Sequence, residues 1–203
     1  MLTLFHAPRS RSSRIVWMLE EMAVPYEIRP VSIYRPITGE GAPDMSNPHP
    51  DKRVPALDHD GLLLAESQAI VLHLADAFPT AGLAPAMDDR RRGDYLTWMA
   101  WYVAEMEPAL FAGLSGELAN SPDKQRGYDA VLNRLHAALS IGNYVMGNDF
   151  CAADILIGSA LNFGRRAFPD DGALDAYVAR CRQRPAALRA LALDDATGLQ
   201  AAA

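Results

Sequence analysis

The sequence predicts an α/β domain followed by an all-helical domain, and three observations lead to this prediction. The first third of the chain contains short apolar runs around amphipathic segments, the pattern of strands and helices. The stretch 79–85 is rich in Pro, Gly and Ala, a composition typical of an interdomain linker. Beyond it, apolar residues recur at helical spacing. We therefore expect one domain at 1–78, a linker at 79–85 and a second domain at 86–203.

Composition and charge exclude several classes of protein. The chain has 203 residues and a formal net charge of −6 at pH 7. This charge argues against a general nucleic-acid-binding protein, and the short basic run 90–92 does not reverse it. No stretch approaches the roughly 18 consecutive apolar residues of a membrane helix. We expect no membrane association, and the cytoplasm is the default location.

Cysteine and histidine usage argues against metal and dithiol chemistry. The two cysteines, Cys151 and Cys181, are far apart and form no CxxC pair. The five histidines show no HExxH or comparable ligand spacing. We therefore expect no metal site, and any thiol chemistry has to use the thiol of a cosubstrate.

The chain opens with a strand, a helix and a second strand. Residues 2–6 are an apolar strand, and a polar turn follows at 7–11. Ser12 or Ser13 can cap the next helix, which ends near the Ala-Val-Pro at 23–25. The apolar residues of this helix recur at i, i+3, i+4 and i+7: Ile15, Met18, Leu19 and Met22. With a second strand at 26–31, this order indicates a βαβ unit with a parallel pair.

The rest of the first domain predicts a hairpin and one more helix. Residues 32–50 form a Pro- and Gly-bearing loop region with room for one short helix of undefined ends. Strands at 54–57 and 62–64 flank a turn at 59–61. A helix opens at Ser67 with these apolar residues on one side: Ile70, Val71, Leu74 and Phe78.

The second half reads as a helical bundle with one central helix. One aromatic stripe could also contribute Tyr95, Trp98 or Tyr102 to a hydrophobic pocket, although such stripes are usually core. The run 152–161 is apolar nearly all round, as expected of a helix buried on every side. The last helix starts at Arg184-Pro185, because proline suits the first turn.

The stretch from Asp51 to Ser67 has the features of a peptide-binding strip. Pro55 cannot donate to a sheet ladder, so it marks a sheet edge, and a cis bond before it would leave the backbone of Val54 free to pair with an extended ligand. The unpaired N–H groups of a helix beginning at Ser67 attract a carboxylate, and Glu66 attracts an amine. Glutathione has these groups in this order.

These residues resemble the glutathione site of the cytosolic glutathione S-transferases, and the resemblance extends over nearly the whole chain. It is carried by Val54-Pro55, Glu66-Ser67 and, in the helical half, Phe150 and Asp154 of a capping motif, where Cys151 replaces the usual serine or threonine. The resemblance implies a thioredoxin-like N-terminal domain, an all-α C-terminal domain and a homodimer. A thiol cap is expected to be weaker than a hydroxyl cap by under about 1 kcal/mol.

The resemblance also implies a role for each matching residue. Pro55 would be the cis-proline, with the backbone of Val54 bound to the cysteinyl part of glutathione. Glu66 would receive the γ-glutamyl amine, and Ser67 would bind its carboxylate. Lys52 and Arg53 replace the usual Gly-Lys, so either can reach the glycyl carboxylate.

Ser10 is the candidate for activating the thiol. The run from Ser10 to Arg14 resembles the serine-type, theta-like bacterial classes, in which a serine after the first strand is followed four residues later by arginine. A hydroxyl and a helix N-terminus near the sulfur lower the thiol pKa from about 8.5. Ser12 is the reserve candidate, and Ser10 can alternatively serve only as a cap.

The leading hypothesis is a detoxifying glutathione transferase that joins the glutathione thiolate to a small hydrophobic electrophile, with no general base and no metal. The first alternative keeps glutathione but changes the reaction to disulfide or peroxide reduction, or to cis-trans isomerisation. The second alternative is a non-catalytic ligand-binding or interaction protein on the same fold.

Overall fold

The structure is a computed structural model that describes the backbone of residues 1–201 and the side chains through Thr197. It contains two compact units. The first joins Met1–Ala81 to the chain from Arg184 onward, and the second is Gly82–Gln183. The last helix was expected in the domain 86–203, but it packs in the first unit. Residues 202 and 203 of that expected domain lie outside the described residues.

A mixed four-stranded sheet forms the centre of the first unit. Its strands are β1 (Leu2–His6), β2 (Tyr26–Pro30), β3 (Ala56–His59) and β4 (Leu62–Ala65), in the order β2-β1-β3-β4. The pair β1–β2 is parallel and the other two pairs are antiparallel. This topology confirms the βαβ opening and the thioredoxin-like arrangement.

Four strand boundaries differ from the sequence prediction. The third strand was expected at 54–57 and begins instead at Ala56, because Pro55 has no N–H to donate to the ladder. The second strand was expected to reach residue 31 and ends at Pro30. The third strand ends at His59 rather than at residue 57, and the fourth ends at Ala65 rather than at residue 64. Between β2 and β3 the described chain contains no helix, and an isolated bridge joins Arg35 to Glu40.

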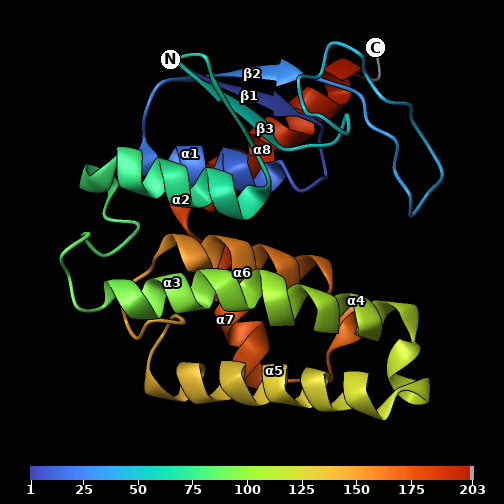
Figure 1. The fold of residues 1–203 in the computed structure, drawn as a ribbon, viewed down its shortest axis with the longest axis vertical. Helices are drawn as coiled ribbons and strands as arrows, with labels where there is room; N and C mark the ends of the chain where they lie inside the picture. The colour runs from blue at the N-terminus through green and yellow to red at the C-terminus, as the bar shows by residue number, and fades with distance from the viewer. Residues whose placement is uncertain (202–203) are drawn as a thin grey trace. The chain divides into compact units, whose positions relative to one another are not determined.

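Three α-helices and one short 3₁₀ turn complete the first unit. They are α1 (Ser13–Met22), α2 (Ser67–Ala77), η1 (Pro79–Ala81) and α8 (Pro185–Ala201). Helices α1 and α2 lie on the same side of the sheet (Figure 1). Helix α8 packs along α1. Arg184, just before α8, forms a two-pronged ion pair with Glu21 in the last turn of α1 at 2.6 and 2.8 Å. At the start of α1, Ser13 contacts Asp194 of α8, so residues far apart in sequence meet at both ends of α1.

The second unit is all-helical, as predicted. Its elements are α3 (Arg92–Trp101), the π-helical turn η2 (Tyr102–Met106), α4 (Glu107–Ser115), η3 (Glu117–Asn120), α5 (Pro122–Ile141), α6 (Ala152–Phe163), η4 (Arg165–Ala167) and α7 (Gly172–Arg182). The predicted aromatic stripe is buried at Tyr95, Trp98 and Tyr102, whereas Val103 is exposed. The π-helical turn shifts the register at this point of the stripe.

Helix α6 is buried on nearly every side, and its N-terminus carries the expected capping motif. Asp154 is fully buried and accepts hydrogen bonds from the backbone N–H of Cys151 at 2.9 Å and of Val145 at 3.0 Å. It also accepts one from the Tyr177 hydroxyl at 2.9 Å. Burial raises the pKa of Asp154, and these hydrogen bonds oppose that rise.

Candidate functional site

The sheet register brings the predicted site segments to one end of the first unit. Phe5 of β1 pairs with Ala56 of β3, and Ala56 pairs with Ala65 of β4. The next residues beyond this row are His6, Pro55 and Glu66. The serine turn, the Val54-Pro55 segment and the start of α2 therefore emerge from the same end of the sheet.

The side chains of Ser10 and Ser12 make different contacts in the turn after β1. Ser12 is fully buried, and its Oγ contacts His6 Nδ1 at 2.8 Å and the N–H and carbonyl of Ala7 at 3.2 Å each. Ser10 is only part-buried, donates from Oγ to the Ala7 carbonyl at 2.6 Å and lies 2.8 Å from Ser12 Oγ. Ser10 is thus the hydroxyl closer to solvent.

Neither predicted cap bonds the helix in the usual way. Ser12 precedes α1, but its side chain makes no cap hydrogen bond with the described helix, because Oγ is turned back to His6 and Ala7. Ser13 Oγ accepts from the N–H of Ser10 at 3.3 Å. Ser10 Oγ donates to the Ala7 carbonyl and also accepts from the N–H of Ser12 at 3.1 Å, so both its capping role and its thiol role stay predictions.

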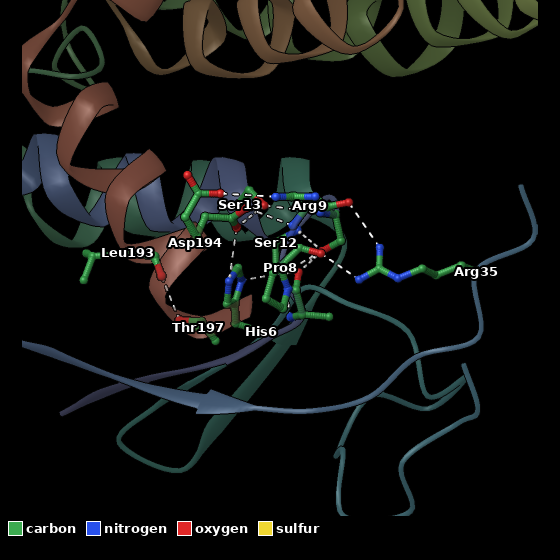
Figure 2. Close-up of polar contacts among 12 residues, drawn as sticks. His6, Pro8, Arg9, Ser12, Ser13, Arg35, Leu193, Asp194 and Thr197 are labelled. Carbon is green, nitrogen blue, oxygen red and sulfur yellow. Dashed lines mark hydrogen bonds and ion pairs between the residues drawn. The ribbon is translucent and has the colours of Figure 1, made fainter. Parts of the chain in front are cut away.

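Two further residues hold this turn, and sequence reasoning missed both. Asp194 of α8 accepts a hydrogen bond from the N–H of Arg9 at 2.8 Å and another from the Ser13 hydroxyl (Figure 2). Arg35 donates to the carbonyls of Pro8 at 2.7 Å and Arg9 at 3.2 Å (Figure 2). No local pattern links Asp194 to residue 9, since 185 positions separate them.

Val54 lies next to the serine turn. Its side chain is buried in a small apolar cluster with Ala7 and Val31. The peptide bond between Val54 and Pro55 is cis, as the sequence resemblance predicted. The preceding loop is fixed by Asn47, whose side chain donates to the Arg53 carbonyl at 2.8 Å. The extended segment therefore starts from a defined loop.

The start of α2 combines an unusual backbone with an unpartnered hydroxyl. Glu66 has φ +66° and ψ 125°, a conformation that non-glycine residues rarely adopt and that clusters at ligand sites. Ser67 begins the helix and is 6% exposed, and its Oγ has no hydrogen-bond partner among the described residues. Burying a hydroxyl costs free energy unless it has a hydrogen-bond partner. A bound anionic group would supply that partner and would also be favoured by the helix N-terminus.

The two basic candidates have different surroundings. Arg53 is exposed and forms ion pairs with Asp51 at 2.8 Å and with Glu66 at 3.5 Å. Lys52 has a left-handed backbone, and its ammonium donates to the Asn47 carbonyl at 2.7 Å. Arg53 is thus brought to Glu66, while the choice between Lys52 and Arg53 for the glycyl carboxylate stays a prediction.

The second unit contains its own depression, near the π-helical turn. Its volume is about 280 Å³, and its lining includes Ala104, Pro108, Phe111, Lys124 and Tyr128. The three aromatic residues predicted for a hydrophobic pocket are absent from its lining. Phe111 is 41% exposed, so it offers an apolar surface there.

Two features are absent from the described residues. These residues hold no group of three or more His, Cys, Asp or Glu side chains suited to a metal ion. None of the described helices combines the length and apolar character needed to cross a membrane.

Comparison with known sequences points to one family. The model of the glutathione S-transferase N-terminal domain matches residues 4–82. Glutathione S-transferase 3 of Schizosaccharomyces pombe is 35% identical over 112 residues, which make up 55% of this chain and 45% of that protein. The chain therefore spans about half the length of this curated relative.

Solved structures match over the full length. The glutathione S-transferase of a sphingomonad, solved in complex with glutathione, is 30% identical with a TM-score of 0.73, and the match covers 95% of this chain and 98% of that one. A glutathione S-transferase from Actinobacillus pleuropneumoniae is 25% identical with a TM-score of 0.82, covering 96% and 93%. With the domain model matching the unit that holds the candidate site, the chain belongs to the glutathione S-transferase family.

Proposed function

We propose that this protein is a glutathione transferase that conjugates glutathione to a small hydrophobic electrophile. The observation that carries the proposal is the start of α2. The buried Ser67 hydroxyl there has no hydrogen-bond partner in the described part of the chain, and it lies at a helix N-terminus beside the strained Glu66. The sheet register brings the serine turn and Val54 to the same end. An anionic head group with an amine beside it suits this combination.

Binding of glutathione is assigned to residues around α2 and β3. The Ser67 hydroxyl and the first N–H groups of α2 bind the γ-glutamyl carboxylate, and Glu66 binds the adjacent amine. The backbone of Val54 holds the cysteinyl part. Lys52 or Arg53 binds the glycyl carboxylate.

Ser10 is assigned to the thiol because it is the more accessible of the two linked serines. Glutathione, when bound, supplies the sulfur nucleophile. Ser10 donates its hydroxyl proton to that sulfur in place of the Ala7 carbonyl, and the positive end of α1 adds to the stabilisation. Ser12, which is fully buried, contacts Ser10 Oγ from the protein interior and does not contact the ligand.

The proposal also covers the oligomeric state of the protein, its cellular role and its location. Leu62 and Leu63 are 52% and 41% exposed on β4, which ends the sheet, and such an apolar edge supports a homodimer. We assign the protein a role in detoxification and a location in the cytoplasm.

The direct test is turnover of chlorodinitrobenzene with glutathione. Conjugation at a rate above the spontaneous reaction supports the transferase. Binding of glutathione without conjugation, but with turnover of a peroxide, a disulfide or a cis-alkene diacid, would favour the reductase or isomerase alternative. Binding without any turnover would favour a ligand-binding protein, and the absence of glutathione binding would overturn both the transferase and its reductase or isomerase alternative.

Ser67→Ala tests the site itself. Because Ser67 Oγ has no described partner, its loss should leave the free energy of unfolding nearly unchanged, whereas the glutathione Kd should rise roughly tenfold or more. Gln68→Ala in the same helical turn is the matched control and should alter neither quantity. An unchanged Kd in Ser67→Ala would remove the proposed carboxylate site.

A further inference from the structure

A continuous row of polar groups runs inward from Ser10 to α8. Ser10 Oγ lies 2.8 Å from Ser12 Oγ, and Ser12 Oγ lies 2.8 Å from His6 Nδ1. On the far side of the ring, His6 Nε2 lies 3.2 Å from Asp194 Oδ1, a contact that is an ion pair only when the ring carries two protons. Figure 2 shows the part of this row from Ser12 through His6 to Asp194. The function proposed above uses only the first member of this row.

The fold builds the row from three elements of the first unit. His6 ends β1 on the same face as Leu2 and Leu4, because side chains alternate along a strand, and it is 0% exposed. Ser12 lies at the start of α1. Asp194 arrives from α8, which packs along α1. A polar ring is thereby buried between two hydroxyls and a carboxylate.

The contacts define which proton each atom carries. The Asp194 carboxylate beside Nε2 favours a proton on that nitrogen, which leaves Nδ1 of a neutral ring as an acceptor. Ser12 Oγ accepts from the N–H of Ala7, so its own proton is available to Nδ1. Ser10 Oγ accepts from the N–H of Ser12 at 3.1 Å, and its single proton can turn from the Ala7 carbonyl at 2.6 Å to Ser12 Oγ at 2.8 Å. Every proton in the row can point towards His6.

The same atoms also support the opposite direction. If Nδ1 gains a proton, the ring donates to Ser12, Ser12 donates to Ser10, and Ser10 donates outward. No heavy atom has to move, because both short contacts are 2.8 Å. A buried imidazolium alone would be costly, but Asp194 at 3.2 Å balances its charge.

We propose that His6 stores the thiol proton: when the S–H bond of bound glutathione breaks, Ser10 takes that proton as it passes its own to Ser12, and Ser12 passes its own to His6 Nδ1. The step leaves a thiolate that accepts from Ser10 and an imidazolium held by Asp194, so the proton is conserved. His6 and Asp194 are positioning residues here, because they act through the two serines. This inference rests on the proposed function of Ser10.

The other charged groups near this row contact surface side chains or the backbone of the loop after β1 rather than the His6 ring. From α8, Asp195 pairs with the exposed Arg9 side chain at 3.7 Å. From the loop after β2, Arg35 binds the carbonyls of Pro8 and Arg9. Asp194 is therefore the carboxylate in contact with the ring among the described residues.

The test on the native protein is a proton count. A pH indicator measures the protons released as glutathione binds, and ultraviolet absorbance measures the thiolate formed. Storage on His6 predicts thiolate formation with almost no proton release to the buffer. Nitrogen NMR of the ring should show Nε2–H with a bare Nδ1 before binding and protons on both nitrogens afterwards. Release of a full proton per thiolate, or a ring that stays neutral, would overturn the proposal.

Variants separate proton storage from a structural role. Asp194→Asn keeps the size and an acceptor oxygen but removes the charge that balances the imidazolium. It should raise the pKa of the bound thiol by about one unit, with little change in glutathione KM. Asp171→Asn, at the other histidine–aspartate pair, is the matched control and should leave the thiol pKa unchanged. If Asp194→Asn does not fold, Ser12→Ala interrupts the row and should have the same effect on the thiol.

The outcomes distinguish failure of this inference from failure of the proposed transferase function on which it rests. A native protein that does not bind glutathione would overturn both the proposed function and the storage of a thiol proton on His6. A protein that binds glutathione and forms thiolate equally well in native, Asp194→Asn and Ser12→Ala forms would keep the transferase and reject the role of His6.

Discussion

The two units each contain a histidine–aspartate pair, and the pairs differ mainly in burial. In the first unit, His6 and Asp194 have side chains that are 0% and 7% exposed. In the second unit, His136 contacts Asp171, and their side chains are 43% and 13% exposed. Both aspartates also bind backbone N–H groups: Asp194 that of Arg9, and Asp171 those of the first turn of α7.

The comparison shows that one residue pair can serve different purposes in different surroundings. Burial raises the pKa of each aspartate, but hydrogen bonds and the nearby histidine outweigh burial and hold both pKa values below the ordinary one. Water screens the half-exposed pair, so Asp171 acts chiefly as the N-cap of α7. The buried pair lies at the end of a hydroxyl row, where the same charges can control a proton.

The largest expected difference between the two pairs is the loss in the free energy of unfolding when each aspartate is replaced by alanine. Asp194→Ala leaves the buried His6 without its carboxylate partner. It also removes the hydrogen-bond acceptor of the Ser13 hydroxyl and of the Arg9 N–H, so we expect a loss of about 3 kcal/mol in the free energy of unfolding. Asp171→Ala should cost about 1 kcal/mol, the usual value of an N-cap. Urea unfolding measures both, and equal losses would show that burial does not separate the pairs.

Acidification should destabilise the protein through both aspartates, and more through Asp194. A carboxyl whose folded pKa is lowered stabilises the fold above its unfolded pKa of about 3.9, and this contribution disappears as the pH falls through the lower folded value. The stability advantage of the native protein over Asp194→Asn should therefore be full near neutral pH and shrink below about pH 4.

The check is a series of urea unfolding curves against pH for the native protein, Asp194→Asn and Asp171→Asn. If the difference between the native protein and Asp194→Asn stayed constant across the acid range, the Asp194 carboxylate would not be the group that carries the effect.

Local patterns predicted the first unit well where neighbouring residues decide the structure. The βαβ opening, the hairpin and the start of α2 at Ser67 follow from apolar alternation and turn residues. The cis bond before Pro55 followed from the resemblance. The boundary of β3 was misplaced by two residues, because the ladder needs an N–H that Pro55 lacks.

Contacts between distant segments could not be predicted from the sequence. The position of α8 beside α1 depends on tertiary packing and the Arg184–Glu21 ion pair, which no periodicity reveals. His6 was predicted as the last residue of the first strand, and the sequence analysis assigned no role to Asp194. Ser12 could be identified as a candidate from its place in the turn, but its link to His6 required coordinates.

The smallest expected difference between the two pairs is the change in their coupling energies when salt is added. At 1 M salt the screening length falls to about 3 Å, so the half-exposed His136–Asp171 pair should lose a few tenths of a kcal/mol. The buried pair should lose almost nothing, because ions cannot approach a ring that is 0% exposed. Double-mutant cycles at low and high salt, with His6→Gln and His136→Gln as the partner substitutions, measure each coupling energy. Equal salt sensitivity would mean that water reaches His6, and a ring open to water would lose its stored proton to the solvent rather than keep it for the serines.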